Sequence, residues 1–165
     1  MSKDPFFSYW LAGLVDGEGC FQVQRQDKTN GKVYYNARFS LALRSDDSFV
    51  IEHIKANIGF GGIYVRRKAT GERYDVKDQI LLDISKRDRC WELSEMLIGK
   101  LRSKKSNQLI GWRNAIIELQ KGHDLANPLL LEYYWSELRT MKKYEYPRWP
   151  DENEEKEEDR CTSHC

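Results

Sequence analysis

Two stretches in which apolar and polar residues alternate, 21–26 and 38–44, set the strongest limit on what this chain can fold into. A period of two is typical of a strand that buries one face and exposes the other. A polar stretch at 27–31 separates the two segments. The pattern predicts a long antiparallel hairpin with one polar face.

Helical periodicity brackets this hairpin on both sides. A first helix is predicted from Ser8, as its N-cap, to the glycines at 17 and 19 that end it. A second follows Asp46, its expected cap, and ends at Gly59, where a left-handed residue is wanted. The apolar positions that define both helices are Trp10, Leu11, Leu14, Val15, Val50, Ile51, Ile54 and Ile58.

The second half of the chain repeats the hairpin and then becomes helical. Residues 63–68 and 79–84 are predicted to pair around a turn at 69–72. Further helices are expected from Asp88 to about Leu101, from near Ser106, and from Pro128. The predicted fold is α+β, an αββαββα core with a four-stranded antiparallel sheet, followed by C-terminal helices.

Length and composition fit one domain, predicted over 1–146. With 40% hydrophobic and 32% charged residues, the chain is not collagen-like, wholly disordered or a disulfide scaffold. The net charge of +1 hides a split, because seven acids and two bases fall in 151–160 and leave 1–150 at about +6. We expect 147–165 to be an acidic, disordered tail.

Targeting signals are sparse. No apolar run reaches the roughly 20 residues that span a bilayer, and the N-terminus has no apolar signal core, so we expect no export and no membrane association. The four cysteines form no framework, and Cys161 and Cys165 have no matching ligand pair for zinc. Reduced thiols in a cytoplasmic or organellar compartment, such as a mitochondrion or chloroplast, are expected.

The segment from Leu11 to Gly19 is unusual for a helix end, because it sets two acids, Asp16 and Glu18, between glycines. A helix C-terminus carries partial negative charge, so each acid is disfavoured by about 0.3–1 kcal/mol unless a cation or a capping contact compensates. A solvated turn is the simpler interpretation of an isolated Asp-Gly pair. The full segment instead indicates a compensating functional contact.

These nine residues resemble the signature of the LAGLIDADG homing endonucleases and match it at six of nine positions. The departures, Val15, Gly17 and Glu18, keep the size or charge class. The predicted element order over about 6–120 is similar to the core of that family. The resemblance implies a site-specific double-strand DNA endonuclease linked to intron or intein mobility, and the single motif implies a homodimer.

The resemblance also implies a metal site. Glu18 would bind Mg²⁺, or another divalent cation such as Mn²⁺, with the backbone oxygen of Gly17 nearby, and the ion would support phosphodiester hydrolysis. A basic residue is expected near the scissile phosphate. Matching the family on the asparagine at 107 gives Arg102, a shifted match gives Lys104, and Arg44 falls at or beside a position that is often Gln.

Small residues predict the dimer contact. Ala12, Gly13 and Gly17 lie on one helical stripe, so two copies of this helix can approach closely and bring two Glu18 carboxylates together. Asp16 is included in this interface, with the family role of holding the helix ends. The alternative is that Gly13 packs against the chain's own sheet.

The polar sheet face is the predicted DNA contact, because Gln can pair with adenine and Arg with guanine in the major groove. Such a face also occurs on any half-buried antiparallel sheet, so the motif is what gives it meaning. The expected partner is duplex DNA with a long, partly palindromic target. The assigned residues are Gln22, Gln24, Gln26, Lys28, Asn36, Arg38, Ser40, Tyr64, Arg66 and Lys68.

Two other functions remain open at this point. A non-catalytic nucleic-acid binder, either an intron RNA maturase or a DNA-binding regulator, would use the same fold. Glu18 favours the enzyme, because a binder has no need of paired carboxylates facing phosphate. An interaction module without nucleic acid would show no salt-sensitive retention on DNA.

Overall fold

The computed structural model of the chain describes residues 4, 6–67, 78–122 and 124–141. Within them it has the predicted element order and confirms the α+β fold. The turn at 69–72, Lys68 and the tail at 147–165 lie outside the described residues. The elements are α1 (Phe7–Glu18), β1 (Gly19–Asp27), β2 (Val33–Arg44), a short 3-10 turn (Ser45–Asp47), α2 (Ser48–Ile58), β3 (Gly62–Arg66), β4 (Gln79–Ile84), α3 (Arg87–Leu97), α4 (Lys105–Gln120) and α5 (Pro128–Met141).

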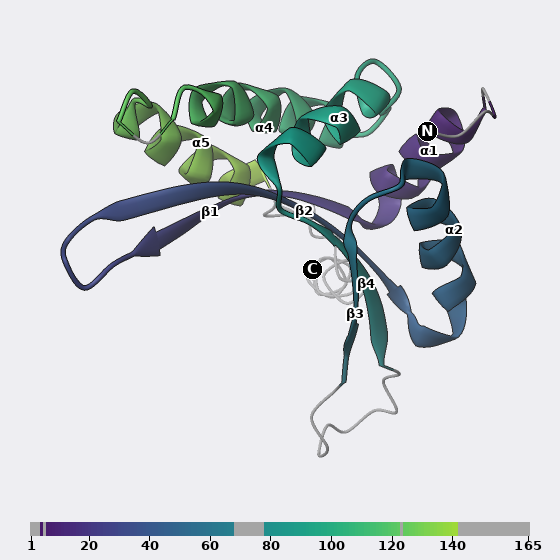
Figure 1. Cartoon of the computed structure of the whole chain (residues 1–165). Helices are drawn as coiled ribbons and strands as arrows, with labels where there is room; N and C mark the ends of the chain where they lie inside the picture. Colours follow the sequence, from purple (N-terminus) through teal and green to yellow (C-terminus); the bar gives the residue numbers. More distant parts are fainter. Residues whose placement is uncertain (1–3, 5, 68–77, 123, 142–165) are drawn as a thin grey trace, which may run out of the picture.

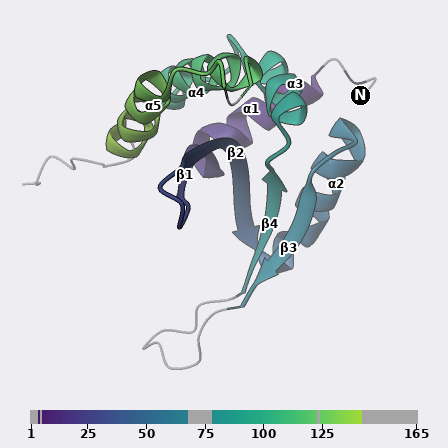
Figure 2. The ribbon, with the colours of Figure 1, turned by 60° about the vertical axis from the view of Figure 1, so that its left-hand side comes forward.

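The four strands form one antiparallel sheet in the order β1-β2-β4-β3. The long strand β2 pairs with β1 along its whole first part and with β4 near its end. Helices α3, α4 and α5 lie over one face of the sheet, which curves beneath them (Figure 1). In the view turned by 60°, α4 and α5 lie over β1 and β2, and α2 lies beside β3 and β4 (Figure 2).

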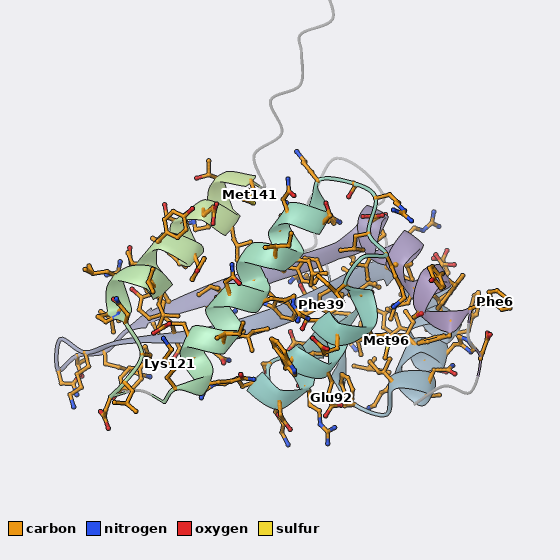
Figure 3. All side chains as sticks on the ribbon, turned by 90° about the horizontal axis from the view of Figure 1, so that it is seen from above. Phe6, Phe39, Glu92, Met96, Lys121 and Met141 are labelled. Atoms are coloured by element: carbon orange, nitrogen blue, oxygen red, sulfur yellow. The ribbon has the colours of Figure 1, made fainter. Side chains whose placement is uncertain are left out.

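The hydrophobic core joins this one sheet face to all five described helices. At its centre the Trp112 ring lies 5.0 Å from the Phe21 ring, and Phe21 lies 5.3 Å from Phe39. Seen from above, Phe39 lies beneath α3 and α4 (Figure 3). The Trp112 indole N–H donates to the Gln22 backbone oxygen at 3.0 Å, so a buried polar group also fixes α4 on β1.

The ends of three helices, α1, α2 and α3, differ from the predictions. Phe6, and not Ser8, precedes α1, and α1 continues through Gly17 because the backbone becomes extended only at Gly19. Asp46 does not cap α2, since it lies in the 3-10 turn and binds the Arg44 guanidinium. Helix α3 ends at Leu97 instead of about Leu101. The left-handed end of α2 at Gly59, φ +82°, is confirmed.

Candidate active site and nucleic-acid interface

The C-terminal end of α1 presents Glu18 as its last residue, exposed to solvent together with Gly17. The Nζ of Lys105 donates to the backbone oxygens of Val15 and Gly17, each at 3.0 Å. Lys105 is the first residue of α4 and is buried. A cation therefore sits on the negative end of the α1 dipole and compensates for the two acids, as the sequence required.

Burial lowers the pKa of Lys105, and the nearby Cys20, Glu18 and Asp16 only partly offset this effect. The charge of Lys105 is thus held at a cost in desolvation, within the field of the carboxylate at Glu18. Lysines placed in this way are frequent at functional sites. Lys105 is therefore the cation that compensates for the negative end of α1.

Lys105 is not among the basic residues predicted from the sequence. The two residues predicted from the same segment, Arg102 and Lys104, are both exposed in the structure. A signal for Lys105 exists in the sequence, since it continues at helical spacing the buried stripe of Leu109, Trp112 and Ile116. A lysine on the apolar stripe of a helix is a stronger functional indicator than a lysine before it.

Asp16 joins α1 to the segment that leads into α4. Its carboxylate accepts hydrogen bonds from the backbone N–H groups of Arg102 at 2.8 Å and Ser103 at 3.2 Å, and from the Ser103 hydroxyl at 2.7 Å. Burial alone would raise the pKa of Asp16, but these hydrogen bonds and the charge of Lys105 bring it below its usual range. Arg102 thus enters the site through its backbone.

Arg44 lies at the end of β2, three residues beyond Leu41, which pairs with Gly19 at the start of β1. At about 3.3 Å per residue this places it about 10 Å along the strand from the end of α1. Its guanidinium binds both carboxylate oxygens of Asp46, at 3.2 and 2.7 Å. The structure does not bring Arg44 into the hydrogen-bonded cluster around Asp16 and Lys105.

The donors at the end of α1 fit a hard divalent cation. A carboxylate at Glu18 and a backbone oxygen at Gly17 are oxygen ligands, and Mg²⁺ commonly takes one or two carboxylates, waters and substrate phosphates. Within the described residues, no group of three or more His, Cys, Asp or Glu could hold a metal ion.

The exposed side of α1 carries two of the three glycines of the motif, Gly13 and Gly17. A Cβ built at Gly13 or at Gly17 would meet nothing within 4 Å, so the packing of this chain does not require either glycine. Gly13 therefore does not pack against the chain's own sheet. Ala12, by contrast, is buried in the core, and Tyr9 and Trp10 beside Gly13 are 61% and 45% exposed.

The polar face of the sheet is assembled as the alternation predicted. Register pairs Gln22 with Arg38 and Gln24 with Asn36 across β1 and β2, and directly paired residues point to the same side. Arg66 pairs with Gln79 on β4, which in turn pairs with Arg44 on β2. The remaining described members of the predicted set are Gln26 on β1, Ser40 on β2, Tyr64 on β3 and Lys28 in the turn after β1.

Several of these side chains already have protein partners. Arg38 is ion-paired with Asp83, the Gln22 amide donates to the Cys20 thiol at 3.2 Å, and the Asn36 amide donates to the Ser85 backbone oxygen at 3.3 Å. Asp83 is not among the residues predicted for this face. Its register with Ser40 puts it on this face, where it orients Arg38.

Known proteins place the chain in a family. The family model described as LAGLIDADG endonuclease matches residues 11–116, which is more than half of the chain, and the chain belongs to this family. A curated relative, the probable intron-encoded endonuclease Cox1-I1b of Schizosaccharomyces pombe, is 36% identical over 58 residues. That match covers 35% of this chain and 15% of the relative.

Solved structures share the fold. The homing endonuclease I-CvuI, crystallised with the I-CreI target and Mg, superposes with a TM-score of 0.65 at 18% identity, covering 86% of this chain and 85% of that one. The archaeal intron-encoded homing endonuclease I-Vdi141I, complexed with DNA, gives 0.66 at 20% identity over 90% and 91%. No described helix of the present chain has the length and apolar character that crossing a membrane requires.

Proposed function

We propose that the chain is a site-specific double-strand DNA endonuclease that acts as a homodimer with a divalent cation. The observation that carries this proposal is the exposed Glu18 at the end of α1, beside the buried Lys105 that neutralises the helix end. Family membership supports nuclease chemistry, and the relatives crystallised with DNA support a duplex substrate.

In this proposal Glu18 and the Gly17 backbone oxygen hold Mg²⁺ or Mn²⁺. When bound, the ion would polarise a phosphate and activate water. Lys105 keeps the Gly17 carbonyl in place and supplies positive charge next to the reacting phosphate. Asp16 positions Lys105 indirectly, because it fixes the segment from which α4 begins.

A second copy of the chain would complete the site. The exposed glycines of α1, which the single chain does not need, suit close contact with another α1. A two-fold axis there would bring two Glu18 carboxylates together, one for each DNA strand. The polar sheet faces would then extend to both sides of the cut and read two half-sites related by symmetry.

The genomic DNA around the reading frame supplies the test substrate. If the reading frame lies in an intron or intein, of a nuclear or an organellar gene, joining the DNA sequences on its two sides gives a candidate target. The purified protein with Mg²⁺ or Mn²⁺ should cut both strands of this duplex at one place, and EDTA should stop it. Retention of the duplex without any cut in either metal would contradict the nuclease and favour the binder.

A splicing assay on the precursor RNA addresses the maturase function separately. The nuclease proposal predicts that the protein neither accelerates splicing nor prefers this RNA over the duplex target. Tight, salt-resistant binding to the intron RNA together with faster splicing and no DNA cleavage would replace the proposed function with the maturase.

A further inference from the structure

The hairpin β1–β2 carries much of the polar face of the sheet, which is the predicted DNA-reading face. The hydrophobic core supports only the part of this hairpin that is away from its turn. On the helix-facing side, Val23 and Ala37 are the last directly paired residues in which both members are buried. In the next helix-facing pair, Arg25 is exposed, and Tyr35 is half-buried at the edge of the core. Beyond the Tyr35 ring, contacts other than the hydrophobic core must hold the hairpin.

One carboxylate on α5 binds both members of that pair. The Arg25 guanidinium donates to Glu132 Oε1 at 2.9 Å, and the Tyr35 hydroxyl donates to Glu132 Oε2. The Arg25 guanidinium also lies over the Trp135 ring, 5.5 Å from its centroid. Glu132 therefore ties β1 and β2 together and ties both to α5.

Hollows flank this contact on both sides. A groove of about 470 Å³ separates α5 from the edge of β1 and is lined by residues 22–26 and by Trp135 and Arg139. A second hollow of about 390 Å³ lies by Tyr35, between the start of β2 and the segment that leads into α5. The two hollows border the two donors of the Glu132 contact, Arg25 and Tyr35.

An isolated surface ion pair contributes little, and Arg25 and Glu132 are 32% and 38% exposed. The Glu132 contact differs because two donors from two strands share one carboxylate, and burial with the bond to Glu132 raises the pKa of Tyr35 to about 12. The Tyr35 hydroxyl therefore remains a donor at any working pH.

We infer that Glu132 is a positioning residue for DNA recognition, which fixes the outer part of the reading face while the core fixes its inner part. The inference rests on the proposed function. Directly behind the Arg25–Tyr35 pair, on the opposite sheet face, lie Gln24 and Gln26 on β1 with Asn36 on β2. Gln22 and Arg38 lie over the buried part of the hairpin and are held by the core.

The test compares Glu132→Gln and Tyr35→Phe with a matched pair on the same helix. Glu137 accepts a hydrogen bond from Tyr133 at 2.9 Å within α5 itself, so Glu137→Gln weakens and Tyr133→Phe removes a similar contact that does not touch the hairpin. Backbone hydrogen exchange in 24–36 should become about 10-fold faster in the Glu132 and Tyr35 variants and stay unchanged in the control pair. Equal hydrogen-exchange rates in all four variants would overturn the inference.

Base preference is then measured by binding to a randomised duplex library. Gln24→Ala and Gln22→Ala first identify the outer and the inner base pairs. Glu132→Gln and Tyr35→Phe should reduce preference about 10-fold at the outer pairs and leave the inner pairs as in the wild type. If the wild type selects a target sequence and these variants show the same base preferences as the wild type, only the inference fails. If the wild type selects no duplex sequence, the proposed function fails and the inference with it.

Discussion

The end of α1 and the polar face of the sheet are built in opposite ways. At the end of α1, the side chains of Asp16 and Lys105 make contacts that join residues 86 to 90 positions apart. On the sheet, side-chain direction follows from alternation within each strand, and neighbouring strands only set the register. Under the proposed function, chemistry would depend on how α4 docks against α1 and recognition mainly on strand pairing, so the two should fail separately.

Replacing Lys105 should give the largest effect at the end of α1. Lys105→Met should abolish cleavage, while the free energy of unfolding changes by about 1 kcal/mol or less, because relief of the desolvation cost offsets the lost hydrogen bonds. Lys104→Met, one residue earlier and exposed, is the matched control and should keep most activity. Cleavage rates and urea unfolding measure both quantities. An active Lys105→Met variant together with an inactive Lys104→Met variant would show that Lys104, as predicted from the sequence, is the basic residue needed for cleavage.

Gly13→Leu tests whether α1 meets a second copy of itself. The added side chain has open space in the single chain, so the stability of the monomer should not fall. At a close helix contact the same side chain should cost about 1–3 kcal/mol of dimer stability. Sedimentation equilibrium measures the dissociation constant. A Gly13→Leu protein that dimerises like the wild type, or a wild-type monomer that cuts both strands cleanly, would contradict the two-fold site.

Asp16→Asn should weaken the docking of α4 in a pH-dependent way. Since the pKa of Asp16 is lowered in the folded protein, its contribution is complete above the ordinary value of 3.8 and disappears as the pH falls through the lowered value. At pH 7 the variant should lose about 1–3 kcal/mol. Urea unfolding at pH 7, 5 and 3 should show this difference shrinking in acid. A difference independent of pH would refute the assignment.

Changes on the sheet face should give the smallest and most local effects. Gln24→Ala or Arg66→Ala should cost about 1–3 kcal/mol at particular base pairs, at two positions placed symmetrically about the cut. Lys28→Ala in the hairpin turn should instead weaken all sequences evenly and lower the salt slope by about one. A randomised target library separates the two patterns. Uniform weakening by both Gln24→Ala and Arg66→Ala would mean that this face does not read bases.

The same contrast explains what sequence reasoning could find. Alternation placed Phe21 and Phe39 in the core and Gln22 and Gln24 on the opposite face, because a period of two is a local property of the chain. The need for a cation at the end of α1 was also predictable from the helix dipole.

Which cation fills this place was not predictable, because it depends on a contact across 88 positions between Gly17 and Lys105. Asp83 beside Arg38 and Glu132 behind the hairpin are also products of tertiary packing. The helix starts were misplaced for a similar reason. The side chains of Ser8 and Asp46 suit a cap, but the chain direction set by the core puts the helix start elsewhere.

Glu18→Gln tests the central claim most directly, that the end of α1 performs the chemistry and the sheet performs the recognition. The substitution removes a charge from the proposed metal ligand and leaves the size of the side chain and the sheet face intact. Gel shifts in Ca²⁺ and cleavage in Mg²⁺ are measured on the same duplex for the wild type and the variant. We predict unchanged affinity and base preference with no cleavage. Undiminished cleavage by Glu18→Gln would contradict the account.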